Sequence, residues 1–186
     1  DRVVWATSMV ACGDADGAVT GNTRRFGASF EKIKQVVDVR KGEIMFGLNM
    51  IVHKGRTIFV GDTSVHEYPT SEQMAEIAIS TARVVRLFGF DPKVAFVSHS
   101  TFGQPLTSRT KHIRNVVEIL KERKVDFEFD GDMQPDVALN SEYKELYPFA
   151  NIVGKANILI MPGQHSAAIS YKLMKTIGDA KVIGPL

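Results

Sequence analysis

The sequence predicts an α/β fold with a mostly parallel sheet and one antiparallel hairpin. Short runs of β-branched residues alternate along the chain with longer segments of helical period, which is typical of repeated βα units. Two of these runs are separated by a turn that is short enough for a hairpin. The 186 residues, 44% apolar and 24% charged, suffice for one well-packed domain or for a compact domain with a smaller lobe.

Two helices are expected at the start of the chain. Residues 3–11 fit either a helix or a strand, and we favour a helix. Residues 26–37 have helical period, with Ile33, Val36 and Val37 facing inward.

The hairpin and a capped helix come next. Residues 44–52 and 57–62 are the expected antiparallel strands. Thr70 and Gln73 form a capping box that begins a helix, and Gly89 ends it. The face of this helix that packs on the sheet carries Met74, Ile77, Ala78, Thr81, Val85 and Phe88.

The rest of the chain repeats the βα pattern. The expected strands are 94–98, 127–130, 157–161 and 181–184, and the expected helices are 111–123 and 165–177. We treat residues 1–186 as one domain, with a lobe crossing predicted near 147–155, where Pro148 and Gly154 interrupt the pattern. Because the chain begins at Asp1 rather than methionine, we expect it to be a fragment of a longer protein.

Composition limits the kinds of partner that we expect the chain to bind and the compartment in which we expect it. Lys and Arg number 23 against 21 Asp and Glu, and a formal charge of +2 supplies no strong field for nucleic acid or an anionic membrane. No apolar run approaches the ~18 residues of a membrane span. The single cysteine, Cys12, cannot form an internal disulfide, and we expect it to be buried as a small hydrophobe. We predict a cytoplasmic protein.

The first candidate site is the turn after strand 94–98. Ligands of open α/β sheets collect at the carboxyl ends of parallel strands. Hydrogen-bonding side chains and a glycine fill this turn, which reads Ser98, His99, Ser100, Thr101, Phe102 and Gly103. An anion or phosphate would suit it, although serine hydroxyls in such turns also bond their own backbone.

The turn after strand 157–161 is the second candidate, with Gln164, His165 and Ser166 at the start of a helix. An acyl or phosphate group could meet this helix start. The alternative is tight packing of the helix on the sheet, with Ser166 as an ordinary cap. A lone histidine does not make His165 a catalytic base.

Three carboxylates, Asp130, Asp132 and Asp136, follow a further strand but lack the spacing of a metal loop. We favour helix capping by Asp132 and a solvated or hydrogen-bonded Asp136, and we keep Asp132 among the candidate ligand contacts.

Asp62 ends another strand, where it could orient a loop or bind a ligand hydroxyl. No dinucleotide fingerprint, P-loop, nucleophile elbow or zinc motif is present.

Several segments resemble the phosphate acetyl/butyryltransferase family in order and spacing, over nearly the whole chain. These segments are 16–21, 61–65, 69–72, 130–140, 154–162, 169–173 and 183–185. Residues 62–65, 98–103 and 133–140 look closer to the carboxyl-terminal domain of multidomain bacterial malic enzymes than to free-standing transacetylases.

The resemblance implies a three-layer α/β/α fold of the isocitrate/isopropylmalate dehydrogenase type, a homodimer or higher oligomer, and a site for acetyl-CoA or a related acyl-CoA. It implies no cofactor in this domain. NAD(P) and Mg or Mn are expected in an amino-terminal malic domain of the parent chain, which would oxidise and decarboxylate malate to pyruvate.

Two departures from the family bear on catalysis. Active transacetylases commonly carry an arginine in the helix after the segment that matches 16–21, and that position here is Glu31. The family's distal active-site segment lies beyond Gly184-Pro185, so we expect residues 1–186 to hold only part of the site.

Three functions remain open at this point. We favour a regulatory, acyl-CoA-binding and oligomerisation domain with no catalytic residue of its own. A phosphate acetyltransferase, in which Ser98, Ser100 and Thr101 hold phosphate or thioester, is the main alternative. A dimerisation module that has lost its ligand ranks last.

Overall fold

A computed structural model describes residues 1–21 and 23–186 of the chain, which divides into two compact units, Asp1–Glu43 and Ile44–Leu186. Segment 147–155 lies within the second unit, and the lobe crossing expected there stays a prediction.

The described residues of the first unit form two helices, α1 (Arg2–Cys12) and α2 (Phe26–Lys34). The preference for a helix at 3–11 is confirmed, and the Asp1 carboxylate caps α1 by accepting from the Val3 amide. The prediction for 26–37 was too long, because the valine pair after α2 forms a turn closed by bonds to the Ile33 carbonyl. β-Branched side chains at 36 and 37 crowd a helix, which favours that ending.

Cys12 is exposed, so the prediction of a buried thiol was wrong. It is the last residue of α1, next to Gly13, whose φ of 82° ends the helix in the left-handed conformation. Apolar neighbours in sequence did not bury Cys12, because the two buried positions of this helix are Val3 and Thr7, on another turn.

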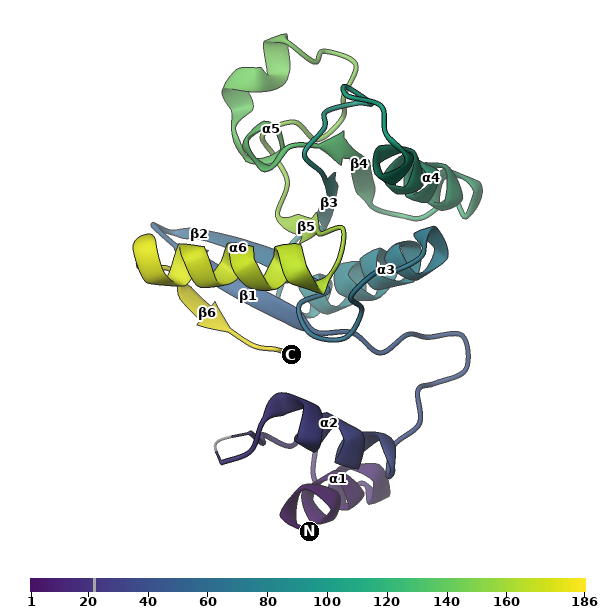
Figure 1. Cartoon of the computed structure of the whole chain (residues 1–186), viewed down its shortest axis with the longest axis vertical. Coiled ribbons are helices and arrows are strands. Elements are labelled where there is room, and N and C mark those ends of the chain that lie inside the picture. Colours follow the sequence, from purple (N-terminus) through teal and green to yellow (C-terminus); the bar gives the residue numbers. More distant parts are fainter. Residues whose placement is uncertain (22) are drawn as a thin grey trace. The chain divides into compact units, whose positions relative to one another are not determined.

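The second unit is built on a six-stranded mixed sheet of order β4-β3-β5-β2-β1-β6 (Figure 1). Strands β2, β5, β3 and β4 run parallel, whereas β1 is antiparallel to both of its neighbours. The strand bounds are β1 Leu48–His53, β2 Arg56–Gly61, β3 Lys93–Val97, β4 Glu128–Met133, β5 Ile158–Ile160 and β6 Lys181–Ile183.

Helices cover both faces of this sheet, which gives three layers. One face packs against α3 (Ser71–Leu87) and α4 (Ser108–Glu122), and the other packs against α5 (Pro135–Leu139) and α6 (Gln164–Ile177). A short 3₁₀ helix, Ser141–Glu145, follows α5. Successive side chains of a strand point to opposite faces, so alternate residues of β3 and β5 enter the two cores. Burial on both faces explains why these strands read as continuous apolar runs.

The expected hairpin is confirmed. Strands β1 and β2 pair from Leu48 with Gly61 to His53 with Arg56. The turn between them is Lys54-Gly55, with φ of 46° and 75°, the positive values that two-residue hairpin turns favour. Residues 44–47, expected in the first strand, precede β1 without strand pairing.

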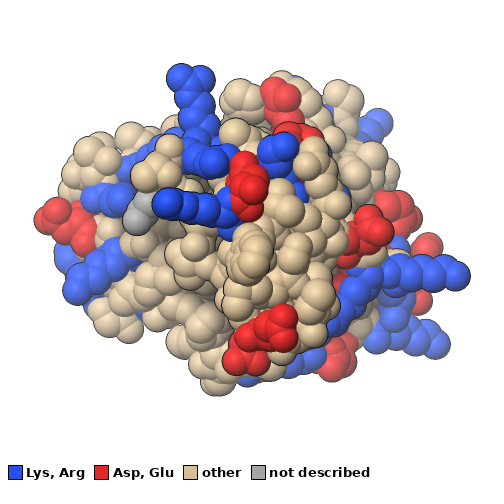
Figure 2. Space-filling view, turned by 90° about the horizontal axis from the view of Figure 1, so that it is seen from below, with Lys and Arg blue, Asp and Glu red and all other residues tan. Residues whose placement is uncertain are grey.

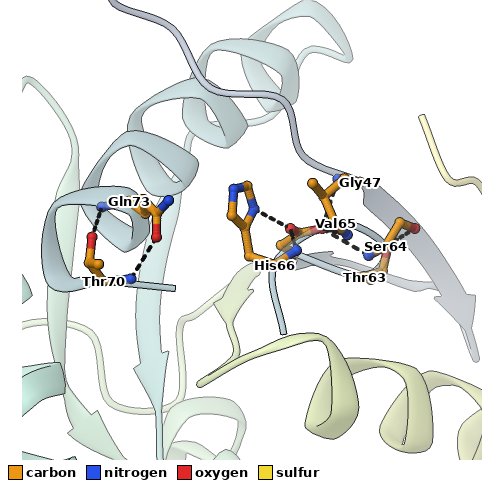
Figure 3. Close-up of polar contacts among 8 residues, drawn as sticks. Gly47, Thr63, Ser64, Val65, His66, Thr70 and Gln73 are labelled. Atoms are coloured by element: carbon orange, nitrogen blue, oxygen red, sulfur yellow. Dashed lines mark hydrogen bonds and ion pairs between the residues drawn. The ribbon is translucent and has the colours of Figure 1, made fainter. Parts of the chain in front are cut away.

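The capping box of α3 is also confirmed. The Thr70 hydroxyl accepts from the Gln73 amide at 3.2 Å, and the Gln73 side chain accepts from the Thr70 amide at 2.8 Å (Figure 3). Gly89, with φ of 82°, follows the end of the helix as expected. Phe88 was expected to face inward but is 47% exposed, although its ring still lies 5.9 Å from that of buried Phe59.

Replacing Thr70 by alanine is expected to lower the free energy of unfolding by about 1 kcal/mol, because the Gln73 amide loses its acceptor. Urea unfolding followed by circular dichroism measures this change. Thr70→Ser is the matched control, since it keeps the oxygen, and it should unfold close to the parent protein. Equal losses in the two variants would show that the cap is not the cause.

Candidate functional site

The four parallel strands end at one edge of the sheet, which we call the carboxyl edge. Strand β3 pairs with β5 along Val94–Phe96, so the turns that follow these two strands emerge side by side. The loop after β2 reaches the same edge from the other side of β5, and the end of β4 reaches it beside β3.

A hollow of about 410 Å³, which we call the crevice, lies between these loops. It brings together the two turns that the sequence singled out, through Ser98 and His99 on one side and Gly163, His165 and Ser166 on the other. The loop after β2 contributes Glu67 and Tyr68, and the first turn of α4 contributes Arg109.

The residues of the turn after β3 divide into two groups. Ser98 lines the crevice, and its hydroxyl also accepts from the Ser100 amide at 3.1 Å, as serine-rich turns often do. Ser100, Thr101 and Gly103 are buried behind the crevice wall. Thr101 accepts from the Gln134 amide, and the fully buried Ser100 hydroxyl has no hydrogen-bond partner among the described residues. The structure thus places Ser98 at the crevice and the other three as its support.

Asp132 lies within β4 and is completely buried, so the prediction that it caps a helix was wrong. One carboxylate oxygen accepts from the Gly103 amide at 3.1 Å, and the other has no partner in the part of the chain that the structure describes. Helix α5 instead begins after Gln134, whose side chain makes no cap bond. Asp132 supports the turn after β3 rather than lining the crevice.

The other two carboxylates of this segment, Asp130 and Asp136, make different contacts from those of Asp132. Asp130 accepts from the backbone amides of Gly131 and Asn151. Asp136 is exposed and hydrogen-bonds Tyr143, which raises the pKa of that phenol. Across residues 1–21 and 23–186, no group of three or more His, Cys, Asp or Glu side chains could hold a metal ion.

The turn after β5 joins α6 to the loop after β2. Gly163 precedes α6, and the Gln164 amide donates to the His66 carbonyl at 2.9 Å. The His165 ring nitrogen Nε2 lies 2.9 Å from the Glu67 carboxylate, with both side chains largely exposed. Ser166 is not an ordinary cap, because its hydroxyl donates to the Gly163 carbonyl at 2.8 Å instead of accepting an amide.

The sequence left two roles open for Asp62, and the structure shows that it orients the loop after β2. It is 1% exposed, and one of its oxygens accepts from the amides of Gly47, Ser64 and Val65. The other accepts from the His66 amide and lies 2.7 Å from the His66 ring nitrogen Nδ1. These bonds fix the loop that carries Glu67 and Tyr68 to the crevice.

Arg109 and Tyr68 are crevice residues that the sequence did not reveal. The Arg109 guanidinium lies 5.8 Å from the centre of the Tyr68 ring, within range of a cation–π interaction. No carboxylate of the described chain forms an ion pair with Arg109. A positive charge is therefore available at the crevice. No local pattern could have predicted it, because the two residues are joined only by the fold.

The charges are mixed elsewhere on the surface. Figure 2 shows Lys and Arg side chains interspersed with Asp and Glu on the face in view, in keeping with the formal charge of +2. Among the described helices, none is both long and apolar enough to cross a membrane.

Fold and crevice together define the class: a three-layer α/β protein with a hollow that holds hydroxyl groups and the Arg109 guanidinium at the carboxyl ends of its parallel strands, where such folds bind ligands. The family model described as "Phosphate acetyl/butaryl transferase" matches residues 1–186, and the chain belongs to this family. The resemblance seen in the sequence is confirmed.

Relatives of two kinds match the whole chain. It is 46% identical to an NADP-dependent malic enzyme of Rhizobium meliloti (strain 1021) and covers 24% of that protein. It is 34% identical to a phosphate acetyltransferase of Clostridium acetobutylicum and covers 59% of it. A phosphotransacetylase structure from Streptococcus pyogenes superposes with a TM-score of 0.92 at 27% identity, over 100% of this chain and 58% of that one. The chain thus spans about a quarter of the malic enzyme and over half of the transferases.

Proposed function

We propose that this chain is an acyl-CoA-binding regulatory and oligomerisation domain of a malic enzyme. The observation that carries the proposal is the crevice, where the guanidinium of Arg109, with which no carboxylate of the described residues pairs, and the hydroxyls of Ser98 and Ser166 surround one hollow. Among the described residues that line it, the one carboxylate, Glu67, lies against His165. Such a hollow suits a ligand with anionic and hydrogen-bonding groups, as CoA thioesters have.

Regulation would follow from differential binding. A ligand that binds one arrangement of lobes or subunits more tightly shifts the population toward it, by as much as its affinities differ. In the parent chain this shift would change the oxidation and decarboxylation of malate, which needs NAD(P) and Mg or Mn in a separate amino-terminal domain. The similarity to bacterial malic enzymes supports such a parent. A homodimer, a cytoplasmic location and the isocitrate/isopropylmalate dehydrogenase-like classification belong to the same proposal.

A phosphate acetyltransferase is the second candidate function, which the similarity to an enzyme of that name supports. Its reaction would transfer the acyl group from CoA to phosphate by direct displacement. Glu31 argues against it. This residue lies in α2, is exposed and pairs with Lys34 at 2.6 Å, so it places a negative charge where the resemblance implies an arginine in active transacetylases.

Calorimetry with acetyl-CoA on the full-length protein that contains this chain tests the proposal. We expect saturable binding and no phosphate-dependent release of CoA. Arg109→Gln should weaken binding about tenfold, the loss of one charge-assisted contact worth roughly 1.5 kcal/mol. The matched control is Arg24→Gln, which removes a charge outside the crevice and should bind as the parent does. No saturable binding at millimolar acetyl-CoA contradicts the proposal, and phosphate-dependent release of CoA favours the second candidate.

A further inference from the structure

A second hollow, of about 330 Å³, adjoins the crevice. It lies where the start of α3 meets the first turns of α4, and its lining shares Tyr68, Arg109 and Pro162 with the crevice. We call it the apolar hollow. Two hollows with three lining residues in common can be occupied by two parts of one ligand.

The chemistry of the apolar hollow differs from that of the crevice. Pro69, Ile113 and Pro162 supply apolar surface, and none of the described residues that line this hollow is a carboxylate. The His112 ring is already engaged, with Nε2 2.9 Å from the Pro69 carbonyl and Nδ1 3.0 Å from the Ser71 hydroxyl. The Thr70 hydroxyl is likewise occupied, since it accepts from the Gln73 amide. With these polar groups satisfied by protein, the part of the hollow beyond Arg109, which it shares with the crevice, favours an apolar group over an ionic one.

Tyr68 and Arg109 form the boundary between the two hollows. Tyr68 is 69% exposed, and the guanidinium of Arg109 lies against its ring. A ligand that spans the boundary would place an anionic or polar group near Arg109 and an apolar group beyond it. An acyl thioester has this division, with a polar carbonyl and CoA end and a hydrocarbon chain.

We propose that the crevice and the apolar hollow bind one thioester together, with its acyl chain in the apolar hollow, so that a four-carbon acyl group is preferred to acetyl. The inference rests on the proposed function, because it takes the crevice to hold the polar part of the thioester. Two additional buried methylene groups tighten binding by roughly fifteenfold, at ~0.8 kcal/mol each. Tyr68 and Arg109 are then the residues that set chain-length specificity and anchor the polar end.

The experiment compares acetyl-CoA, butyryl-CoA and free CoA by calorimetry on the full-length protein. We expect butyryl-CoA to bind on the order of tenfold more tightly than acetyl-CoA. Ser108 lines the apolar hollow and is exposed, so Ser108→Leu should fill the hollow and bring the two dissociation constants together. Arg109→Gln should weaken both thioesters and leave their ratio as in the parent. The matched control, Ser141→Leu, adds the same side chain at an exposed position outside both hollows.

The outcomes separate the inference from the proposed function. Equal affinities for acetyl-CoA and butyryl-CoA in the parent protein overturn the inference and leave the proposed function standing. If Ser108→Leu still binds butyryl-CoA more tightly than acetyl-CoA, and its melting temperature matches that of the parent, then the acyl chain does not occupy the apolar hollow. If none of the three ligands binds, the proposed function fails and the inference falls with it.

Discussion

Asp62→Ala is expected to lower the free energy of unfolding by about 4 kcal/mol, since four backbone amides lose their acceptor at a net cost of roughly 1 kcal/mol each. The carboxylate is 1% exposed, so water cannot readily replace it. Urea unfolding measures the loss. A change below about 1 kcal/mol would mean that the loop finds other acceptors, and the orienting role of Asp62 would be withdrawn.

Asp62→Asn is the matched control for this experiment. Its carbonyl oxygen can still accept from the Gly47, Ser64 and Val65 amides, whereas its amide group cannot accept from His66. We therefore expect the free energy of unfolding of Asp62→Asn to lie between that of the parent protein and that of Asp62→Ala. Equal losses for asparagine and alanine would point to the charge rather than to the bonded geometry.

The Asp62→Ala substitution should also affect the crevice. The loop held by Asp62 supplies Glu67 and Tyr68, and its His66 carbonyl accepts from the Gln164 amide at the start of α6. Releasing the loop therefore loosens two walls of the crevice. In Asp62→Ala, at a temperature where the protein remains folded, the affinity for acetyl-CoA should fall further than in Asp62→Asn.

Gly163→Ala carries the second large expected effect. A β-carbon at Gly163 would overlap the backbone carbonyl oxygen of Glu67, and a backbone atom cannot move aside as a flexible side chain can. The loop after β2 and the start of α6 would have to separate. We expect the free energy of unfolding to fall by about 2 to 3 kcal/mol. Acetyl-CoA affinity should fall by at least about tenfold, because the two sides of the crevice no longer hold their spacing.

Gly27→Ala is the matched control, because it makes the same substitution where, outside its own helix and chain neighbours, no described atom lies within 4 Å of the added carbon. Gly27 lies in α2, where alanine favours the helix by up to about 1 kcal/mol over glycine. The control should thus be neutral or slightly more stable, with unchanged affinity. If Gly163→Ala behaves as the control does, close approach of the loop and α6 is not required for the site.

Local signals along the chain account for most of the secondary structure. The capping box at Thr70 and Gln73 begins α3 where expected, because both of its bonds join residues three apart. The hairpin was predictable for the same reason, since a short turn fixes its pairing. Errors occurred where local signals were weak, as at the end of α2 and at the start of β1.

The two candidate turns show how much of the candidate site could be predicted from the sequence. Their place after β3 and β5 follows from the chain, because parallel strands end at a common edge. Which of their side chains line the crevice does not follow. Ser98 faces it and Ser100 is buried behind it, although both are serines of one turn.

Periodicity, turns and motifs within short stretches were enough to predict most of the helices and strands, the parallel arrangement, the family and the edge at which the candidate site lies. Only the tertiary structure decided that Asp132 is buried, that Cys12 is exposed, and that Arg109 lies on Tyr68. Each of these depends on packing between residues far apart along the chain, which no local pattern encodes.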